Sequence, residues 1–227
     1  MELHHFKVIA RIQTDFKTKF GIPRQSGLVQ EVEGKIVFEP DYRNPDAVRG
    51  LGDFTHIWLI WQFSEAVREQ WSPTVRPPRL GGNKRMGVFA TRSPFRPNAI
   101  GLSCVRLEKV EYTQNDGPVL YVSGVDLMDG TPIYDIKPYL PYADCHPEAV
   151  GGFASTPKEA TLQVVDPNNL LSNVCEEKRK ALVGILSQDP RPTYQNDPKR
   201  VYGMCFGGYE VKFRVVDNQL WIESILE

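Results

Sequence analysis

The stretch "THIWLIWQF", residues 55–63, decides the fold. It is dominated by apolar residues, and Thr, Ile, Trp and Phe are residue types that favour β-strands. An apolar run of this length is typical of a strand that is buried on both of its faces. We therefore expect residues 55–63 to form a central buried strand, with Trp58 and Trp61 inside the protein.

Strand patterns also dominate the rest of the first 140 residues. The stretch "FKVIARI", for example, alternates apolar and polar side chains, which is the period of a half-buried strand. The tripeptide "NDG", residues 115–117, has the residue chemistry of a hairpin turn between two such runs. Further strands are expected at residues 6–12, 86–91, 101–110, 118–127 and 131–139, and short helices at 44–51 and 65–71.

The order of these segments indicates the fold class. No alternation of strand and helix is visible, so a parallel sheet is not expected. We predict a mainly β protein whose antiparallel sheet closes into a β-barrel, and a sandwich is the alternative. A small C-terminal α+β unit follows the barrel.

The C-terminal unit is expected to begin near residue 156, because residues 141–156 lose periodicity and gather Pro, Gly and small residues. We predict two domains, residues 1–155 and residues 156–227. In the second, residues 169–186 are expected to form a helix, and residues 209–215 and 220–226 to form strands. The apolar stripe of that helix would comprise Leu171, Val174, Cys175, Leu182, Ile185 and Leu186.

Composition excludes several classes of protein. The chain has 227 residues and a formal net charge of −1, and it contains no run of 18 apolar residues and no apolar signal segment at its N-terminus. We expect no membrane span and a cytoplasmic protein. The four cysteines are far apart without a CxxC pair, so we expect reduced thiols and no metal site. Rossmann, P-loop, G-x-S-x-G and HExxH motifs do not occur.

The charge is unevenly distributed along the chain. Residues 70–107 contain no Asp or Glu. The same segment carries seven cations, so an anionic ligand is expected there, and a solvated basic face is the alternative. These cations are Arg76, Arg79, Lys84, Arg85, Arg92, Arg96 and Arg106.

Three loops combine residues that stiffen the backbone with polar side chains. The first, "GIPRQSGL" at residues 21–28, offers hydrogen-bond donors from Arg24 and Gln25. The second, "RSPFRPN" at residues 92–98, contains two prolines that restrict the residues before them and so direct two guanidinium groups. The third, residues 126–142, is rich in Asp. A cationic loop beside an acidic loop suits a ligand of mixed charge.

Four segments resemble a known family. They are "PRQSGL" (23–28), "PTVRPPRLGGNKRMGVFATRSPFRPNAIGLS" (73–103), "DGTPIYDIKPYLPY" (129–142) and "QDPRPTY" (188–194). These segments resemble the signature of the TsaA-like, or TrmO, family of tRNA methyltransferases, and the likeness runs over essentially the whole chain. Ser26 is one departure, because several relatives have Pro there.

The resemblance implies an S-adenosylmethionine-dependent enzyme, built on a β-barrel without a Rossmann domain and working as a homodimer. Its substrate would be N6-threonylcarbamoyladenosine at tRNA position 37, beside the anticodon, which gains a methyl group on N6. Two classes of alternative remain open. A non-catalytic barrel that binds RNA would fit the basic segment, and a sensor that binds S-adenosylmethionine would fit the ligand loops.

The resemblance also assigns roles to residues. The cofactor pocket would comprise Pro23, Arg24, Gln25, His56, Ile57, Arg92, Leu102, Asp129, Gly130, Thr131 and Pro132. Residues that would face tRNA are Lys84, Arg85, Arg96, Arg191, Lys199 and Arg200. Because N6 of the carbamoylated base is a poor nucleophile, Asp135 or Asp126 is a candidate catalytic base.

Overall fold

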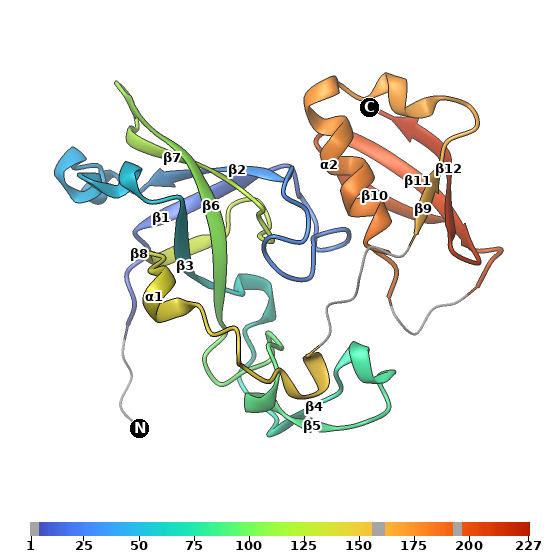
Figure 1. Ribbon diagram of the computed structural model, residues 1–227, viewed down its shortest axis with the longest axis horizontal. Coiled ribbons are helices and arrows are strands. Elements are labelled where there is room, and N and C mark those ends of the chain that lie inside the picture. The colour runs from blue at the N-terminus through green and yellow to red at the C-terminus, as the bar shows by residue number, and fades with distance from the viewer. Residues whose placement is uncertain (1–4, 156–161, 193–196) are drawn as a thin grey trace.

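The protein folds into two β units, a barrel and a smaller sheet that carries a helix (Figure 1). The computed structural model describes residues 5–155, 162–192 and 197–227. Residues 156–161, where the C-terminal domain was expected to begin, and residues 193 and 194 of the "QDPRPTY" segment lie outside the described residues. Within the described ranges, no helix is both long enough and apolar enough to cross a bilayer.

The larger unit is a closed antiparallel barrel, which confirms the predicted fold class. Its strands follow the order β1-β2-β7-β6-β3-β8. Every neighbouring pair around this barrel is antiparallel. The strands are β1 (Ala10–Thr14), β2 (Glu33–Phe38), β3 (His56–Gln62), β6 (Ile100–Thr113), β7 (Gly117–Ser123) and β8 (Pro132–Pro138).

The stretch at residues 55–63 is confirmed as a central strand. It forms β3, which pairs with β6 on one side and β8 on the other. Its inward side chains are Ile57, Leu59 and Trp61, all buried. The expected burial of both faces is wrong, since outward residues such as Trp58 are only half-buried. A closed barrel has its own core on one face of each strand, and the outer face needs a separate cover.

Trp61 packs against a glycine on the neighbouring strand. Gly101 of β6 lies opposite Trp61, and a Cβ added to Gly101 would lie 2.3 Å from the indole ring. We expect Gly101→Ala to lower the free energy of unfolding by about 2–3 kcal/mol, because an overpacked core must shift its side chains and backbone. Urea denaturation checks this value. In the matched control Gly203→Ala, the added Cβ meets nothing within 4 Å, and equal losses in both variants would contradict the argument.

The connection from β3 to β6 was predicted less well. Of residues 86–91, only Met86–Gly87 form a strand, β5, which pairs with β4 (Thr74–Val75). Residues 65–71 do not form the expected helix beyond a single 3-10 turn. This excursion, residues 63–99, is rich in Pro and Gly. These residues interrupt the backbone hydrogen bonds of the strands that the neighbouring apolar residues would otherwise favour.

Short helical turns connect the barrel strands. The expected helix at 44–51 is a pair of 3-10 turns, and the strand expected at 6–12 begins only at Ala10. The turns are η1 (Pro40–Tyr42), η2 (Pro45–Val48), η3 (Leu51–Asp53), η4 (Ser64–Ala66), η5 (Pro78–Leu80), η6 (Val88–Ala90), η7 (Gly152–Ala154) and η8 (Leu170–Asn173), with the short helix α1 (Pro141–Asp144).

The C-terminal unit is a four-stranded sheet packed against one helix. The sheet order is β10-β11-β12-β9, and the expected alternation of β11 is confirmed. The helix is shorter than predicted, because it begins at Glu176 and Cys175 lies exposed before it. The elements are β9 (Gln163–Val165), α2 (Glu176–Ser187), β10 (Tyr202–Phe206), β11 (Tyr209–Val216) and β12 (Gln219–Leu226).

The C-terminal unit packs against the loop between β1 and β2. Phe16 and Phe206 are both buried there, with ring centroids 5.2 Å apart. The Lys178 ammonium lies 2.8 Å from the Asp15 carboxylate, and the Gly207 amide donates to the Asp15 carbonyl at 3.1 Å. One hydrophobic core therefore continues from the barrel into the small sheet.

Candidate ligand site at one end of the barrel

The first two loops that stand out in the sequence and the start of the third leave the barrel at the same end. They belong to the connections from β1 to β2, from β3 to β6 and from β7 to β8. The rest of the third segment is not a loop there, because residues 132–138 form β8. Strand register places the ends of these strands side by side, since Thr14 lies opposite Gly34 and Gln62 lies opposite Ile100. Ile133, at the start of β8, lies opposite Trp61. Segments far apart in the chain thus form one loop cluster, next to the C-terminal unit (Figure 1).

The loop at residues 21–28 runs along the edge of β6. β6 pairs with β7 only from Arg106 onward, which leaves the first half of β6 without a strand on that side. Ser26 fills part of this gap, because its hydroxyl accepts a hydrogen bond from the Cys104 amide at 3.2 Å. The Gly27 amide also donates to the Gly124 carbonyl at 2.9 Å. These contacts hold the predicted cofactor loop against the strand that carries Leu102.

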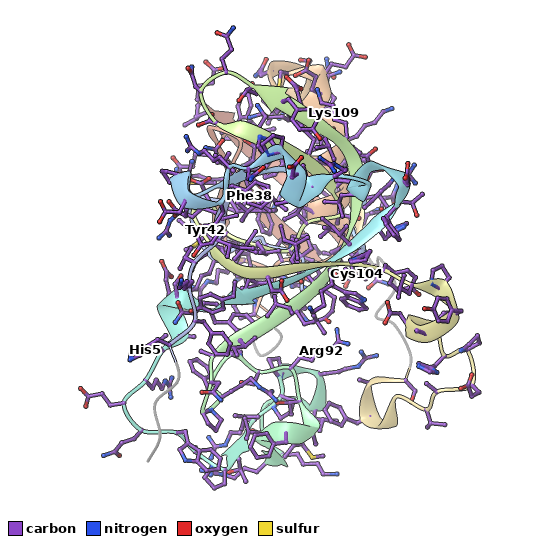
Figure 2. The ribbon with its side chains drawn as sticks, turned by 90° about the vertical axis from the view of Figure 1, so that its left-hand side faces the viewer. His5, Phe38, Tyr42, Arg92, Cys104 and Lys109 are labelled. Atoms are coloured by element: carbon purple, nitrogen blue, oxygen red, sulfur yellow. The ribbon has the colours of Figure 1, made fainter. Side chains whose placement is uncertain are left out.

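Arg92 joins this loop from the β3–β6 excursion. Its Nη1 donates to the Gln25 side-chain oxygen. The guanidinium is exposed, and no carboxylate of the described residues forms an ion pair with it. Figure 2 labels Arg92 below Cys104, on the side of the excursion. Leu102 faces outward with 52% of its surface exposed. The structure thus brings Gln25, Arg92 and Leu102 to one region.

A partly buried carboxylate lies beneath the loop. Asp126 accepts a hydrogen bond from the Ser103 hydroxyl at 2.6 Å, and Ser103 accepts one from the Trp61 indole at 3.0 Å. The Ser26 backbone also hydrogen-bonds to the carboxylate. Burial raises the pKa of Asp126 to about 6, although these hydrogen bonds and nearby Arg92 act in the opposite direction. Asp126 therefore ties the loop to the barrel wall.

The raised pKa makes a prediction about stability. Because the carboxyl has a higher pKa when folded, the folded state binds more protons than the unfolded state between about pH 4 and pH 6. Stability attributable to Asp126 therefore falls as pH rises through this window, by about 3 kcal/mol for a rise from 3.8 to about 6. Urea denaturation of wild type and Asp126→Asn across this range measures the difference. Parallel stability curves would contradict the prediction.

The segment Asp129–Pro132 lies at the same barrel end but contacts β1. The Asp129 carboxylate accepts from the Thr14 amide at 3.0 Å and pairs with Lys17 at 2.6 Å. Gly130 donates to the Ile12 carbonyl, and the Thr131 side chain is buried. Among the described residues, no hydrogen bond or ion pair joins this segment to Arg92 or Gln25.

His56 and Ile57 are not brought to the loop cluster. They begin β3, whereas the cluster lies at its other end, about 20 Å away along the strand. The Ile57 side chain points into the barrel and is fully buried, so it lines no open apolar slot. His56 lies on the outer face and contacts the Thr55 hydroxyl at 3.0 Å.

Asp135 lies on the outer face in the same row as Leu102. Strand register aligns Leu102 with Ile60 and Ile60 with Asp135 across three neighbouring strands. Two strand spacings correspond to about 10 Å. Asp135 is half-exposed and pairs with Lys137 at 2.9 Å.

The cations expected to face tRNA fall into two groups. Arg96 donates to the carbonyls of Val88 and Thr91. Arg191 forms a two-point ion pair with Asp189, and 11% of the Arg191 side chain is exposed. Both arginines thus hold local structure. The Arg191 carbonyl also accepts from Arg24 at 3.2 Å. The other group is exposed and comprises Lys84, Arg85, Lys199 and Arg200.

Sequence reasoning did not identify the hydrogen bonds from Trp61 to Ser103 and from Ser103 to Asp126. One signal was present in the strand pattern. Ser103 alternates with Gly101 and Val105 on the inward face of β6, and a polar side chain on an inward face requires a buried partner. The partner itself, after β7, could not be identified from the strand pattern alone.

The fold and the loop cluster define a class of protein, a closed β-barrel whose ligand loops gather at one end. Comparisons with known proteins identify the family. The model of the tRNA-methyltransferase O N-terminal domain matches residues 11–145, and the model of the TrmO C-terminal domain matches residues 160–227. The chain belongs to the tRNA-methyltransferase O family.

Individual relatives agree with this assignment. A protein of Escherichia coli named tRNA (adenine(37)-N6)-methyltransferase is 41% identical over 96% of this chain and 95% of its own length. A protein of the same name from Eikenella corrodens is 45% identical over 76% of this chain and 97% of its own. A crystal structure of TrmO from Pseudomonas aeruginosa aligns with a TM-score of 0.82 at 31% identity, covering 100% of this chain and 99% of that one.

Proposed function

We propose that this protein methylates N6 of the adenosine at position 37 of tRNA, with S-adenosylmethionine as the methyl donor. The observation that carries the proposal is the exposed Arg92 guanidinium, held by Gln25 beside the outward Leu102, in a chain of this family. We further propose that the substrate carries the N6-threonylcarbamoyl group and that the enzyme works as a homodimer. Sedimentation velocity tests the dimer.

The chemistry of the residues fits this cofactor. S-adenosylmethionine presents a carboxylate, an adenine and a sulfonium whose methyl group is transferred to a nucleophile. Arg92 has a planar fork of donors that suits a carboxylate. Leu102 supplies an exposed apolar surface that suits an adenine ring. The carbonyl groups of the loop at residues 21–28 are acceptors that suit a cation, whereas the Asp129 oxygens already bind Thr14 and Lys17.

The reaction depends mainly on positioning, because a displacement at a methyl group requires two reactants in line. We propose that Asp126 is a positioning residue, since Ser26 and Ser103 already occupy its oxygens. Asp135 has an exposed carboxylate in the row of Leu102, and we propose that it accepts the N6 proton. Asp135→Asn is expected to lower kcat about a hundredfold with unchanged cofactor affinity. Unchanged kcat would overturn this role.

One experiment tests the function. The protein is incubated with S-adenosylmethionine and with either unmodified or threonylcarbamoylated tRNA, and the nucleosides are then analysed by mass spectrometry. We expect one added methyl group on threonylcarbamoyladenosine. Absence of methylation on both tRNAs would overturn the proposal. Cofactor binding without turnover would favour a sensor, and tRNA binding without cofactor binding would favour a non-catalytic RNA-binding barrel.

A further inference from the structure

Three aromatic side chains protrude from the β3–β6 excursion. Phe89, Trp71 and Phe95 are exposed over 72%, 51% and 40% of their surfaces. The rings of Trp71 and Phe89 are neighbours, with centroids 6.1 Å apart and planes inclined by 32°. We call these three residues the aromatic patch. Exposed groups of large apolar side chains mark interaction surfaces, since water disfavours them.

Arginines stack on two of these rings. The Arg68 guanidinium carbon lies 3.8 Å from the centroid of Phe95, and that of Arg96 lies 5.9 Å from the centroid of Phe89. Such contacts are cation–π interactions, which orient a guanidinium over a ring. The patch therefore presents aromatic faces and positive charge together.

Acidic residues are scarce around the patch: within the excursion they are Glu65, which pairs with Lys19 at 2.9 Å, and Glu69. Residues 70–107 lack Asp and Glu altogether. Among the described residues, only one cation of this segment, Arg106, forms an ion pair, and its partner Glu108 lies just beyond the segment. Four exposed cations of the segment can therefore meet an external anion, namely Arg76, Arg79, Lys84 and Arg85. Arg96 is held by backbone carbonyls, and Arg92 is assigned to the cofactor.

We propose that the aromatic patch stacks unpaired bases of the anticodon loop of tRNA while the surrounding cations contact its phosphates. This inference rests on the proposed function and names the surface that receives the substrate. A polyanion with accessible base faces matches both the charge and the rings. Double-stranded RNA matches only the charge, because its bases are stacked inside the helix.

A second copy of the chain fits this surface poorly. A symmetric dimer would bring the same patch of both subunits together. The cations of residues 70–107 in each copy would then approach the like charges of the other, and that segment supplies no carboxylate to offset them, which disfavours association. The homodimer is therefore expected to use another face.

The patch is rigidly linked to the candidate cofactor site. Arg96 Nη1 donates to the Val88 carbonyl at 3.2 Å and to the Thr91 carbonyl at 2.6 Å, which fixes the turn between Phe89 and Arg92. Phe89 is three residues before Arg92, whose guanidinium contacts Gln25. Bases stacked on the patch would thus lie beside the residues that we propose bind the methyl donor.

The test compares two RNAs, an anticodon stem-loop and a blunt duplex of the same length. We expect Trp71→Ala and Phe89→Ala each to weaken stem-loop binding by about tenfold to a hundredfold. Duplex binding should change less than twofold. The dependence of affinity on salt should stay the same in these variants, whereas the double variant Lys84→Ala and Arg85→Ala should lower its slope by about 2.

Matched variants identify the cause of any loss. Val67→Ala removes an exposed apolar side chain without a ring, and it should bind both RNAs like the wild type. Phe89→Leu keeps an apolar side chain but loses the ring, so it should bind the stem-loop weakly. S-adenosylmethionine affinity, measured by calorimetry, should be normal in both aromatic variants, which shows that they are folded.

Three results from binding and assembly would overturn the inference. They are unchanged stem-loop affinity in Trp71→Ala and Phe89→Ala, equal losses for stem-loop and duplex, and conversion of a wild-type dimer to a monomer by either substitution. The last would assign the patch to the subunit interface. If the wild type methylates tRNA and the aromatic variants keep its KM for tRNA, the inference about the aromatic patch fails while the proposed function stands. If wild type methylates no tRNA, the proposed function fails.

Discussion

Replacing Arg92 by alanine is expected to weaken S-adenosylmethionine binding by about tenfold to a hundredfold, because a hydrogen bond to a charged group contributes about 1.5–3 kcal/mol. The side chain is exposed, and its only hydrogen bond among the described residues is to Gln25, so the substitution removes little packing. Arg92→Lys keeps the charge but loses the planar fork, and we expect an intermediate affinity. Isothermal titration calorimetry measures both variants.

A neighbouring cation serves as the control for Arg92. Arg79 lies in the same acid-free segment and is also exposed, but it has no contact with Gln25 among the described residues. Arg79→Ala is expected to bind the cofactor like the wild type. Equal losses in both variants would mean that the segment acts only through its total charge. Normal affinity in Arg92→Ala would remove Arg92 from the site.

The strands of the barrel were predictable because their side chains alternate. The run at residues 101–110 and the turn at 115–117 correspond to β6, β7 and the hairpin between them. Closure of the barrel was harder to predict from the sequence, because the pairing of β1 with β8 joins segments more than 100 residues apart. The register of that pair depends on side chains from the whole core.

The sequence predicted which loops form the candidate site, but it did not predict which side chains contact each other there. Residues that stiffen the backbone identified the loops at 21–28 and 92–98, and strand topology then brought them together. Local sequence could not indicate that Arg96 and Arg191 bind neighbouring carbonyl and carboxylate groups. The exposed rings of Trp71 and Phe89 were also not expected, because residues 65–71 and 86–91 have the patterns of a helix and a strand.

Phe206→Ala is expected to lower the free energy of unfolding by about 3–5 kcal/mol, the usual cost of a cavity left by a buried aromatic side chain. Phe206 is 2% exposed and packs on Phe16, which belongs to the loop between β1 and β2. The cavity would therefore open at the contact between the barrel and the C-terminal sheet. Urea denaturation followed by circular dichroism measures the loss.

The same experiment tests whether the two units unfold together. Because one hydrophobic core spans both units, wild type should unfold in a single transition. Phe206→Ala should shift that transition to lower urea or split it in two, as the small sheet loses its support from the barrel. The control Val201→Ala changes a residue that is 53% exposed and should shift stability by less than about 0.5 kcal/mol. A loss below about 1 kcal/mol in Phe206→Ala would mean that the contact between Phe16 and Phe206 does not hold the units together.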